Sequence, residues 1–213
     1  MAKDQSYMLY TLGEEELRRS LFPVGGQTKA ETRAHAERLG LPVAGKPDSQ
    51  EVCFVPDADH AAFLEERAPH LVRSGEIVDA TGAVIGMHRG SFRYTIGQRR
   101  GLGVSTGRAN FVVDLDRDAN RVVVGPGELL ARRRLVADRV TWVAGEPPSE
   151  GPFEAEVGIR YRGTAAPAVI ETQGDSMRVE FRRPERAIAP GQAAVVYAGE
   201  ELLGGGRIVE SIR

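Results

Sequence analysis

The stretch Phe111-Val-Val-Asp-Leu-Asp-Arg-Asp-Ala-Asn-Arg-Val-Val-Val124 decides the fold class of this chain of 213 residues. Two short apolar runs rich in valine flank a polar segment whose aspartate and asparagine residues favour a turn. Two strand-forming runs joined by a turn predict a β-hairpin. The stretch Gly75-Glu-Ile-Val-Asp-Ala-Thr-Gly-Ala-Val-Ile-Gly86 has the same pattern and predicts a second hairpin.

Hairpin-like spacing continues from about Leu135 to the end of the chain. Several short strands at regular intervals, separated by glycine turns, predict a small antiparallel β-barrel. Three consecutive glycines at 204–206 lie inside this strand pattern and predict a bulge or a close approach of two backbones. The expected strands are 168–172 and 177–181, which flank Gly174-Asp175, and 195–197 and 202–209, which flank Gly199.

The first 70 residues have a helical pattern instead. Thr28 and Glu31 form a capping box at the start of a helix that Gly40 ends. A short helix is expected from about Asp59 to Ala68, and leucine spacing predicts helix over residues 6–22. We therefore predict an α+β, mostly β fold with three parts, namely a helical part over residues 1–68, a central β domain over residues 69–131 and a C-terminal antiparallel β-barrel over residues 132–213.

Cys53 is the only cysteine, so it has no partner for an internal disulfide. It lies in Lys46-Pro-Asp-Ser-Gln-Glu-Val-Cys-Phe-Val55, where Pro-Asp-Ser predicts a turn and the apolar residues predict a short strand. This setting favours a thiol that is held firmly and can be reached by a reactant. The alternative is a buried cysteine that acts as a small apolar side chain.

The segment Glu154-Ala-Glu-Val-Gly-Ile-Arg-Tyr-Arg162 alternates between apolar and polar residues, which predicts a strand. On that strand Arg160 and Arg162 would project outward with Tyr161 between them. Two guanidinium groups beside an aromatic ring suit a surface that binds phosphates and stacks on a base. The alternative is a solvated strand face with Tyr161 in the core.

A second candidate for anion binding is Tyr94-Thr-Ile-Gly-Gln-Arg-Arg-Gly-Leu-Gly103, in which glycines frame Arg99 and Arg100. Such a loop can offer backbone N–H groups and guanidinium groups to an anion. It matches neither a P-loop nor a dinucleotide-binding fingerprint. A hairpin turn is the alternative interpretation.

Composition argues against several other classes. A net charge of −2 is unlike that of a protein whose entire surface binds nucleic acid. No apolar run approaches the ~18 residues of a membrane span, and a single cysteine without a secretion signal indicates the cytoplasm. The four histidines and one cysteine have no metal-ligand spacing, so we expect no metal site.

Six motifs occur in the order found in one protein family and extend over nearly the full sequence. They are Lys3-Asp-Gln-Ser-Tyr7, Leu21-Phe-Pro-Val-Gly25, Lys46-Pro-Asp-Ser49 followed by Val52-Cys-Phe54, Thr95-Ile-Gly-Gln-Arg-Arg-Gly-Leu-Gly103, Arg160-Tyr-Arg162, and Pro190-Gly-Gln192 followed by Leu203-Gly-Gly-Gly206. In these motifs the chain resembles the tRNA-specific 2-thiouridylases. The family's N-terminal ATP-pyrophosphatase loop and first catalytic cysteine have no counterpart here, so the resemblance implies the C-terminal portion of such an enzyme.

The resemblance also implies a reaction. In this family the wobble uridine of lysine, glutamate and glutamine tRNAs is adenylated with ATP, and a cysteine persulfide then displaces AMP. Cys53 matches the cysteine that carries the persulfide, which a donor protein supplies, and a thiolate or persulfide is a strong nucleophile. By the same resemblance the residues that contact tRNA are Lys3, Asp4, Gln5, Arg160, Tyr161 and Gln192, and Arg99, Arg100 and Arg162 are further candidates.

Two other functions are compatible with the sequence. The chain can be a tRNA-binding module without turnover, since the ATP site is expected outside it. It can also be a sulfur-relay or redox protein that binds no RNA. Residues 1–68 are expected to expose apolar surface that the missing portion would cover.

Overall fold

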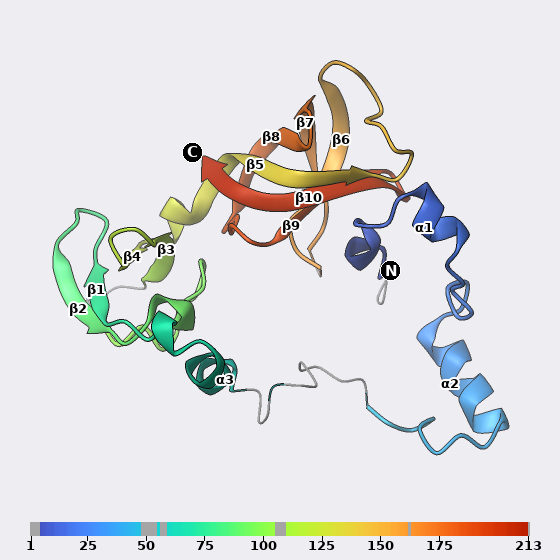
Figure 1. Ribbon diagram of the computed structural model, residues 1–213, viewed down its shortest axis with the longest axis horizontal. Helices are drawn as coiled ribbons and strands as arrows, with labels where there is room; N and C mark the ends of the chain where they lie inside the picture. Colours follow the sequence, from blue (N-terminus) through green and yellow to red (C-terminus); the bar gives the residue numbers. More distant parts are fainter. Residues whose placement is uncertain (1–4, 48–54, 56–58, 105–109, 162, 213) are drawn as a thin grey trace.

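A computed structural model describes residues 5–47, 55, 59–104, 110–161 and 163–212. Figure 1 shows a barrel, a smaller separate sheet and a helical N-terminal part. The sheet has four strands and the closed barrel has six. The predicted α+β, mostly β fold is therefore confirmed.

The helical part differs in one place from the prediction. The capping box is present, because Thr28 Oγ1 accepts from the Glu31 amide and the Glu31 carboxylate accepts from the Thr28 amide. A continuous helix over residues 6–22 is wrong, since Gly13 is extended and its amide bonds to the Glu16 carboxylate. The helices are η1 (Ser6–Leu9), α1 (Glu14–Arg18), α2 (Lys29–Arg38), α3 (His60–Arg67) and η3 (Pro69–Leu71).

The central sheet contains both predicted hairpins. Its strand order is β2-β1-β4-β3, in which β1 and β4 are parallel and the other neighbours are antiparallel. One face packs a small core around Ile77, Val112 and Val122, which are fully buried. The strands are β1 (Gly75–Val78), β2 (Val84–His88), β3 (Phe111–Asp116) and β4 (Arg121–Gly125), and η4 (Ser91–Arg93) follows β2.

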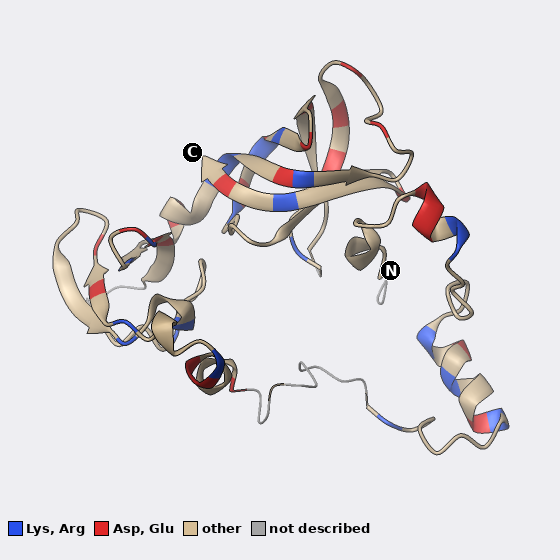
Figure 2. Ribbon diagram, in the orientation of Figure 1, with Lys and Arg blue, Asp and Glu red and all other residues tan. Residues whose placement is uncertain are grey.

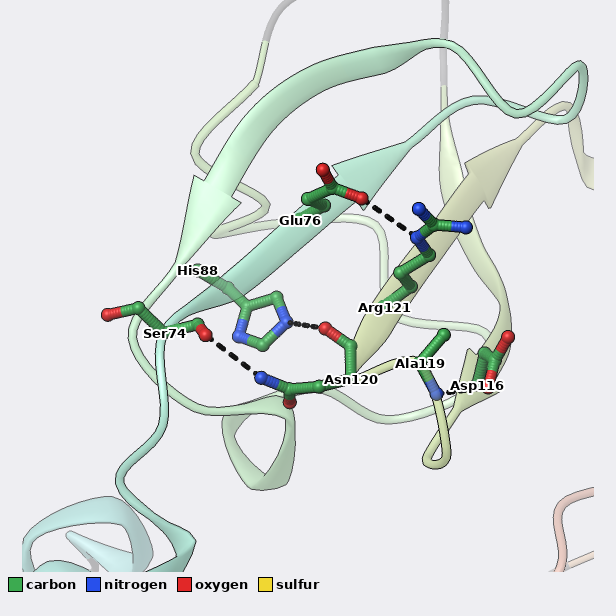
Figure 3. A network of polar contacts seen from close by, with 7 residues as sticks. All are labelled: Ser74, Glu76, His88, Asp116, Ala119, Asn120 and Arg121. Atoms are coloured by element: carbon green, nitrogen blue, oxygen red, sulfur yellow. Dashed lines mark hydrogen bonds and ion pairs between the residues drawn. The ribbon is translucent and has the colours of Figure 1, made fainter.

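His88 connects the end of β2 to the turn between β3 and β4 (Figure 3). Its Nε2 lies 3.1 Å from the carbonyl oxygen of Asn120, and its Nδ1 accepts from the amide of Gly90. The amide of the Asn120 side chain donates to the Ser74 carbonyl at 2.9 Å. His88 is almost fully buried, so both ring nitrogens need these partners, and this histidine has a structural role.

The barrel closes in the order β10-β5-β8-β7-β6-β9, with antiparallel neighbours throughout. Its core is separate from that of the sheet and includes Phe181, Ile170 and Met177. The predicted hairpins around Gly174 and Gly199 are confirmed. The strands are β5 (Ala131–Trp142), β6 (Phe153–Gly158), β7 (Ala166–Gln173), β8 (Ser176–Arg186), β9 (Ala193–Ala198) and β10 (Glu201–Ile212), and η5 (Gly127–Leu130) precedes β5.

Gly204, Gly205 and Gly206 lie in β10 where neighbouring backbones approach closely, as the sequence predicted. A Cβ atom on Gly204 would lie 2.3 Å from the Thr141 carbonyl oxygen, and one on Gly206 would lie 2.8 Å from that of Asp138. The pairing with β5 and β9 also shifts register within this strand. Side chains are therefore excluded here by the packing of the barrel.

Residues 5–47 contribute no buried residue to either core. The expected apolar surface is present, since Leu21 is 90% exposed and Leu39 is 69% exposed. Figure 1 shows α1 and α2 extending away from the barrel. Within the described part of the chain, no helix has both the length and the apolar character needed to span a membrane.

Candidate nucleic-acid interface

The N-terminal segment contacts the barrel through Tyr7. The hydroxyl of Tyr7, in η1, donates to the Ala193 carbonyl at 2.9 Å, across 186 positions of sequence. Its ring centroid lies 6.2 Å from that of Tyr161. Gln192 directly precedes Ala193, and Gln5 directly precedes η1 as its N-cap residue. Four residues predicted to contact tRNA therefore gather around Tyr7: Gln5, Arg160, Tyr161 and Gln192.

Arg160 and Tyr161 do not lie on a strand, so the prediction of an arginine pair on an outer strand face is wrong. Strand β6 ends at Gly158, and the amide of Gly163 closes a turn on the Arg160 carbonyl at 3.0 Å. Val157 and Ile159, apolar residues of the alternating segment, are buried. Alternation alone gave no sign of this turn, because apolar and polar residues continue to alternate through it.

The guanidinium group of Arg160 reaches the loop after β8. Its Nη2 donates to the carbonyl of Arg186 and, at 3.3 Å, to that of Ala187. Among the residues described, no carboxylate pairs with it. Arg160 is exposed and Tyr161 retains 37% of its accessible surface, so both can meet a ligand from solvent.

The walls of the barrel have a different charge distribution. Basic and acidic residues are interspersed along its strands (Figure 2). Several arginines there are neutralised by carboxylates, which leaves the turn at Arg160 as a more available positive group for phosphate. The ion pairs are Arg133 with Glu180 at 3.4 Å, Arg207 with Asp138 at 2.9 Å, and Arg182 with Glu154.

The environment of Tyr7 keeps its hydroxyl protonated. Burial raises the pKa of Tyr7 to about 12, and the neighbouring Tyr10 and Tyr197 add to this shift. The positive charge of Arg160 lowers the pKa slightly but does not offset burial. At neutral pH Tyr7 is therefore a hydrogen-bond donor, as its contact with a carbonyl requires.

The glycine-rich segment around Arg99 is irregular rather than a hairpin. Its backbone pairs with β3, because the Gly97 amide donates to the Val112 carbonyl at 2.8 Å and the Val112 amide donates to the Gln98 carbonyl. The amide of Gly97 is thus not free for an anion. Arg99 and Arg100 are exposed.

The glycine-rich segment also contacts the barrel. A Cβ on Gly97 would lie 3.1 Å from the Cβ of Ala187, so this segment lies against the same loop that Arg160 contacts. The two basic segments found in the sequence are therefore connected through Arg186 and Ala187. Sequence patterns gave no sign of this contact, nor of the role of Tyr7, although Tyr7 belongs to the first quoted motif.

Four predicted residues lie outside the described residues, namely Cys53, Lys3, Asp4 and Arg162. Within the ranges that the structure describes, no three His, Cys, Asp or Glu side chains are grouped to hold a metal ion. The described residues of the site offer an aromatic ring, a guanidinium group and amide side chains. Groups of these kinds can stack on a base and bind phosphate.

Three family models match successive parts of the chain. They are described as the tRNA methyl transferase HUP domain, over residues 1–57, the tRNA methyl transferase PRC-barrel domain, over residues 61–126, and the aminomethyltransferase beta-barrel domain, over residues 132–208. The second and third ranges contain the central sheet and most of the barrel.

Curated relatives carry the name tRNA-specific 2-thiouridylase MnmA. The protein of Heliobacterium modesticaldum is 51% identical over 99% of this chain and 55% of its own length. Those of Roseiflexus castenholzii and Geobacter metallireducens are 49% and 48% identical, each over 97% of this chain and 56% of their own length. The chain thus spans about half the length of the curated relatives it matches. Because its identity to these relatives extends over nearly all of its residues, the chain belongs to the family of the tRNA-specific 2-thiouridylases.

Proposed function

We propose that this chain is the tRNA-binding, sulfur-carrying portion of a cytoplasmic sulfurtransferase that 2-thiolates the wobble uridine of lysine, glutamate and glutamine tRNAs. The observation that carries the proposal is the grouping of Gln5, Arg160, Tyr161 and Gln192 around Tyr7. These residues come from the N-terminal segment and from the barrel, and together they offer a stacking ring and phosphate-binding groups. The family of the chain supports tRNA as the ligand.

The chemistry assigned to Cys53 is nucleophilic. The uracil C2 carbonyl reacts slowly because oxygen is a poor leaving group, and transfer of AMP from ATP to that oxygen makes it a good one. The terminal sulfur of a persulfide on Cys53 then attacks C2, and AMP departs with the oxygen. The thiolate of the family's other catalytic cysteine, which we place outside this chain, next attacks the Cys53 sulfur, so that 2-thiouridine is released and the two cysteines form a disulfide. The persulfide comes from a donor protein, and ATP binds a domain that we place outside this chain.

The domain limits belong to the same proposal. We place the end of the Cys53 part at residue 68 and the start of the barrel domain at residue 132. The two separate apolar cores support a central domain and a barrel domain that fold around their own strands. The exposed leucines of residues 5–47 support a first part that is completed by another domain.

Binding of unmodified lysine tRNA across a salt series tests the interface. We expect salt-sensitive binding that Arg160→Ala/Arg162→Ala weakens. Each guanidinium–phosphate contact releases counterions from the RNA, so loss of one contact makes the plot of log binding constant against log salt concentration less steep by about 1. The matched control is Arg178→Ala/Arg183→Ala, which removes two exposed arginines from β8. An equal loss in both double variants would show that binding depends on total charge and would contradict this interface.

A tRNA-binding module without turnover is the second candidate, favoured by the share of the relatives that the chain spans. We expect no ATP-dependent thiolation by this chain alone, and 2-thiouridine formed by it would contradict the placement of the ATP site. Cys53→Ser should abolish sulfur loading and leave RNA binding unchanged. Loss of both would indicate a structural cysteine, and sulfur loading without RNA affinity would favour a sulfur-relay protein.

A further inference from the structure

We propose that Tyr7 is a positioning residue that joins the N-terminal segment and the barrel into one RNA-binding surface. The inference rests on the proposed function, and it adds a residue that contacts protein rather than RNA. Tyr7 holds the segment of Gln5 against the turn of Arg160 and Tyr161. Without this contact the two groups of RNA-binding residues would be connected only through the rest of the fold.

The contacts of Tyr7 fix the segment in both position and orientation. The hydroxyl donates to the Ala193 carbonyl, at the start of β9, at 2.9 Å. The ring lies against Gly158, where a Cβ would be 3.8 Å from the ring carbons, and at a 58° angle to the ring of Tyr161. One hydrogen bond and two ring contacts, one at the end of β6 and one in the turn that follows it, leave the side chain little freedom to rotate.

Tyr10 supplies a second contact between the same segment and the barrel. Its Cδ2 would lie 2.8 Å from a Cβ on Gly205, so the ring occupies the space that the absent side chain leaves. The carboxylate-paired Arg207, two residues further along β10, is close enough to interact electrostatically with Tyr10. The three glycines therefore have two effects: they allow the strands to pair closely, and they leave space in which the Tyr10 ring packs.

The described N-terminal residues share no apolar core with the barrel. None of residues 5–47 is buried, and the segment beyond η1 extends away from the barrel. The position of Gln5 relative to Tyr161 is therefore controlled by Tyr7 and Tyr10 and not by a shared core. Such a local contact can open without unfolding the barrel.

The first test measures docking without RNA. Hydrogen–deuterium exchange of residues 5–12 should be about fivefold faster in Tyr7→Phe, which keeps the ring and removes one hydrogen bond, and faster still in Tyr7→Leu. Tyr10→Phe is the matched control, because the structure gives the Tyr10 hydroxyl no hydrogen bond among the described residues. Unchanged exchange in both Tyr7 variants overturns the inference.

The second test is a double-substitution cycle read by affinity for unmodified lysine tRNA. Gln5→Ala should weaken binding in the unaltered chain and have little further effect in the Tyr7→Leu chain, because the segment is already displaced. A merely structural role would give the same fold-change in both backgrounds, and that additive result overturns the inference. Tyr7→Phe serves in the same cycle if Tyr7→Leu does not fold.

The two proposals fail in distinguishable ways. Binding by the unaltered chain with additive effects of Tyr7 and Gln5 overturns only the positioning role. Absence of binding by the unaltered chain at low salt overturns the proposed function, and the RNA role of Tyr7 with it. In that case faster exchange in Tyr7→Phe would still show that the hydroxyl docks the segment.

Discussion

Single side chains determine how the N-terminal segment of this protein meets the barrel. Tyr7 is half-buried and donates its only proton to a backbone carbonyl, so its ionisation would remove the donor and place a charge among neighbouring tyrosines. Gly205 contributes by the absence of a side chain. A hydroxyl and the absence of a methyl group therefore contribute to this interface together with the arginines.

Titration of tyrosinate absorbance tests the environment of Tyr7. The pKa is raised from 10.0 to about 12, so the folded chain keeps this proton where the unfolded chain loses it. The resulting stabilisation is complete below pH 10 and is lost as the pH rises through about 12. We expect Tyr7→Phe to remove an ionisation near pH 12 from the titration of the chain. A variant that removes an ionisation near pH 10 instead would contradict the burial of this hydroxyl.

Gly205→Ala tests the close approach within β10. The new Cβ would lie 2.8 Å from the Ala194 carbonyl oxygen and from Tyr10 Cδ2, and the backbone oxygen has no room to move in a paired strand. We expect the free energy of unfolding in urea to fall by about 1–3 kcal/mol, as for other overpacked sites. Gly151→Ala is the control, since a Cβ there meets nothing within 4 Å. Equal stability of both variants would refute the steric argument.

Among the secondary-structure elements, short polar turns set the register of the central hairpins. The carboxylate of Asp79 accepts from the Thr81 hydroxyl at 2.7 Å, from the Thr81 amide at 2.8 Å and from the Ala83 amide at 3.1 Å. These bonds close the connection between β1 and β2. They also lower the pKa of Asp79 below its ordinary 3.8, because each donor favours the charged form.

The pH dependence of thermal unfolding tests this turn. Because the pKa of folded Asp79 is lowered, its stabilisation is present above pH 3.8 and is lost as the pH falls through the lower folded value. Asp79→Ala should lower Tm at neutral pH, and the difference from the unaltered chain should shrink below pH 3.8. A difference that stays constant down to strong acid would mean that the carboxylate's charge does not stabilise the turn.

At the scale of the whole molecule, the contact between the central sheet and the barrel determines how these two parts are placed relative to each other. The guanidinium of Arg186 lies 4.6 Å from the centroid of the Phe111 ring, and the Ala187 amide donates to the Leu130 carbonyl at 2.9 Å. Arg160 and Gly97 contact the same loop from opposite domains. Since the two cores are separate, these few contacts determine how the basic segments of each domain align.

Arg186→Ala should loosen this contact without unfolding either core. A cation–π contact at an exposed site contributes about 0.5–1 kcal/mol, so we expect limited proteolysis between residues 126 and 130 to be about two- to fivefold faster. Arg183→Ala, an exposed arginine on the same strand, is the control. Equal cleavage rates for the two variants would mean that the Phe111 contact does not hold the domains together.

Local sequence patterns were sufficient for much of the fold. Period-two alternation and turn residues predicted the hairpins of sheet and barrel, and the Thr28-Glu31 capping box predicted α2, because each depends on neighbours within a few residues. The same patterns failed at Gly13, where one glycine interrupts the leucine spacing, and at Arg160, where alternation runs past the end of β6. At Gly13 the glycine itself disfavours a continuous helix and was the local signal, whereas at Arg160 local propensity gave none.

The sequence also determined the family and, through its motifs, the residues expected to bind RNA. Packing over long sequence separations decided how those residues are arranged. The bond from Tyr7 to Ala193 and the bonds from Arg160 to the loop after β8 join segments that no periodicity relates. Such contacts form only when the barrel closes, because closure brings the ends of distant strands together. The sequence therefore predicted which residues form the interface, but only the closed barrel determines where those residues come together.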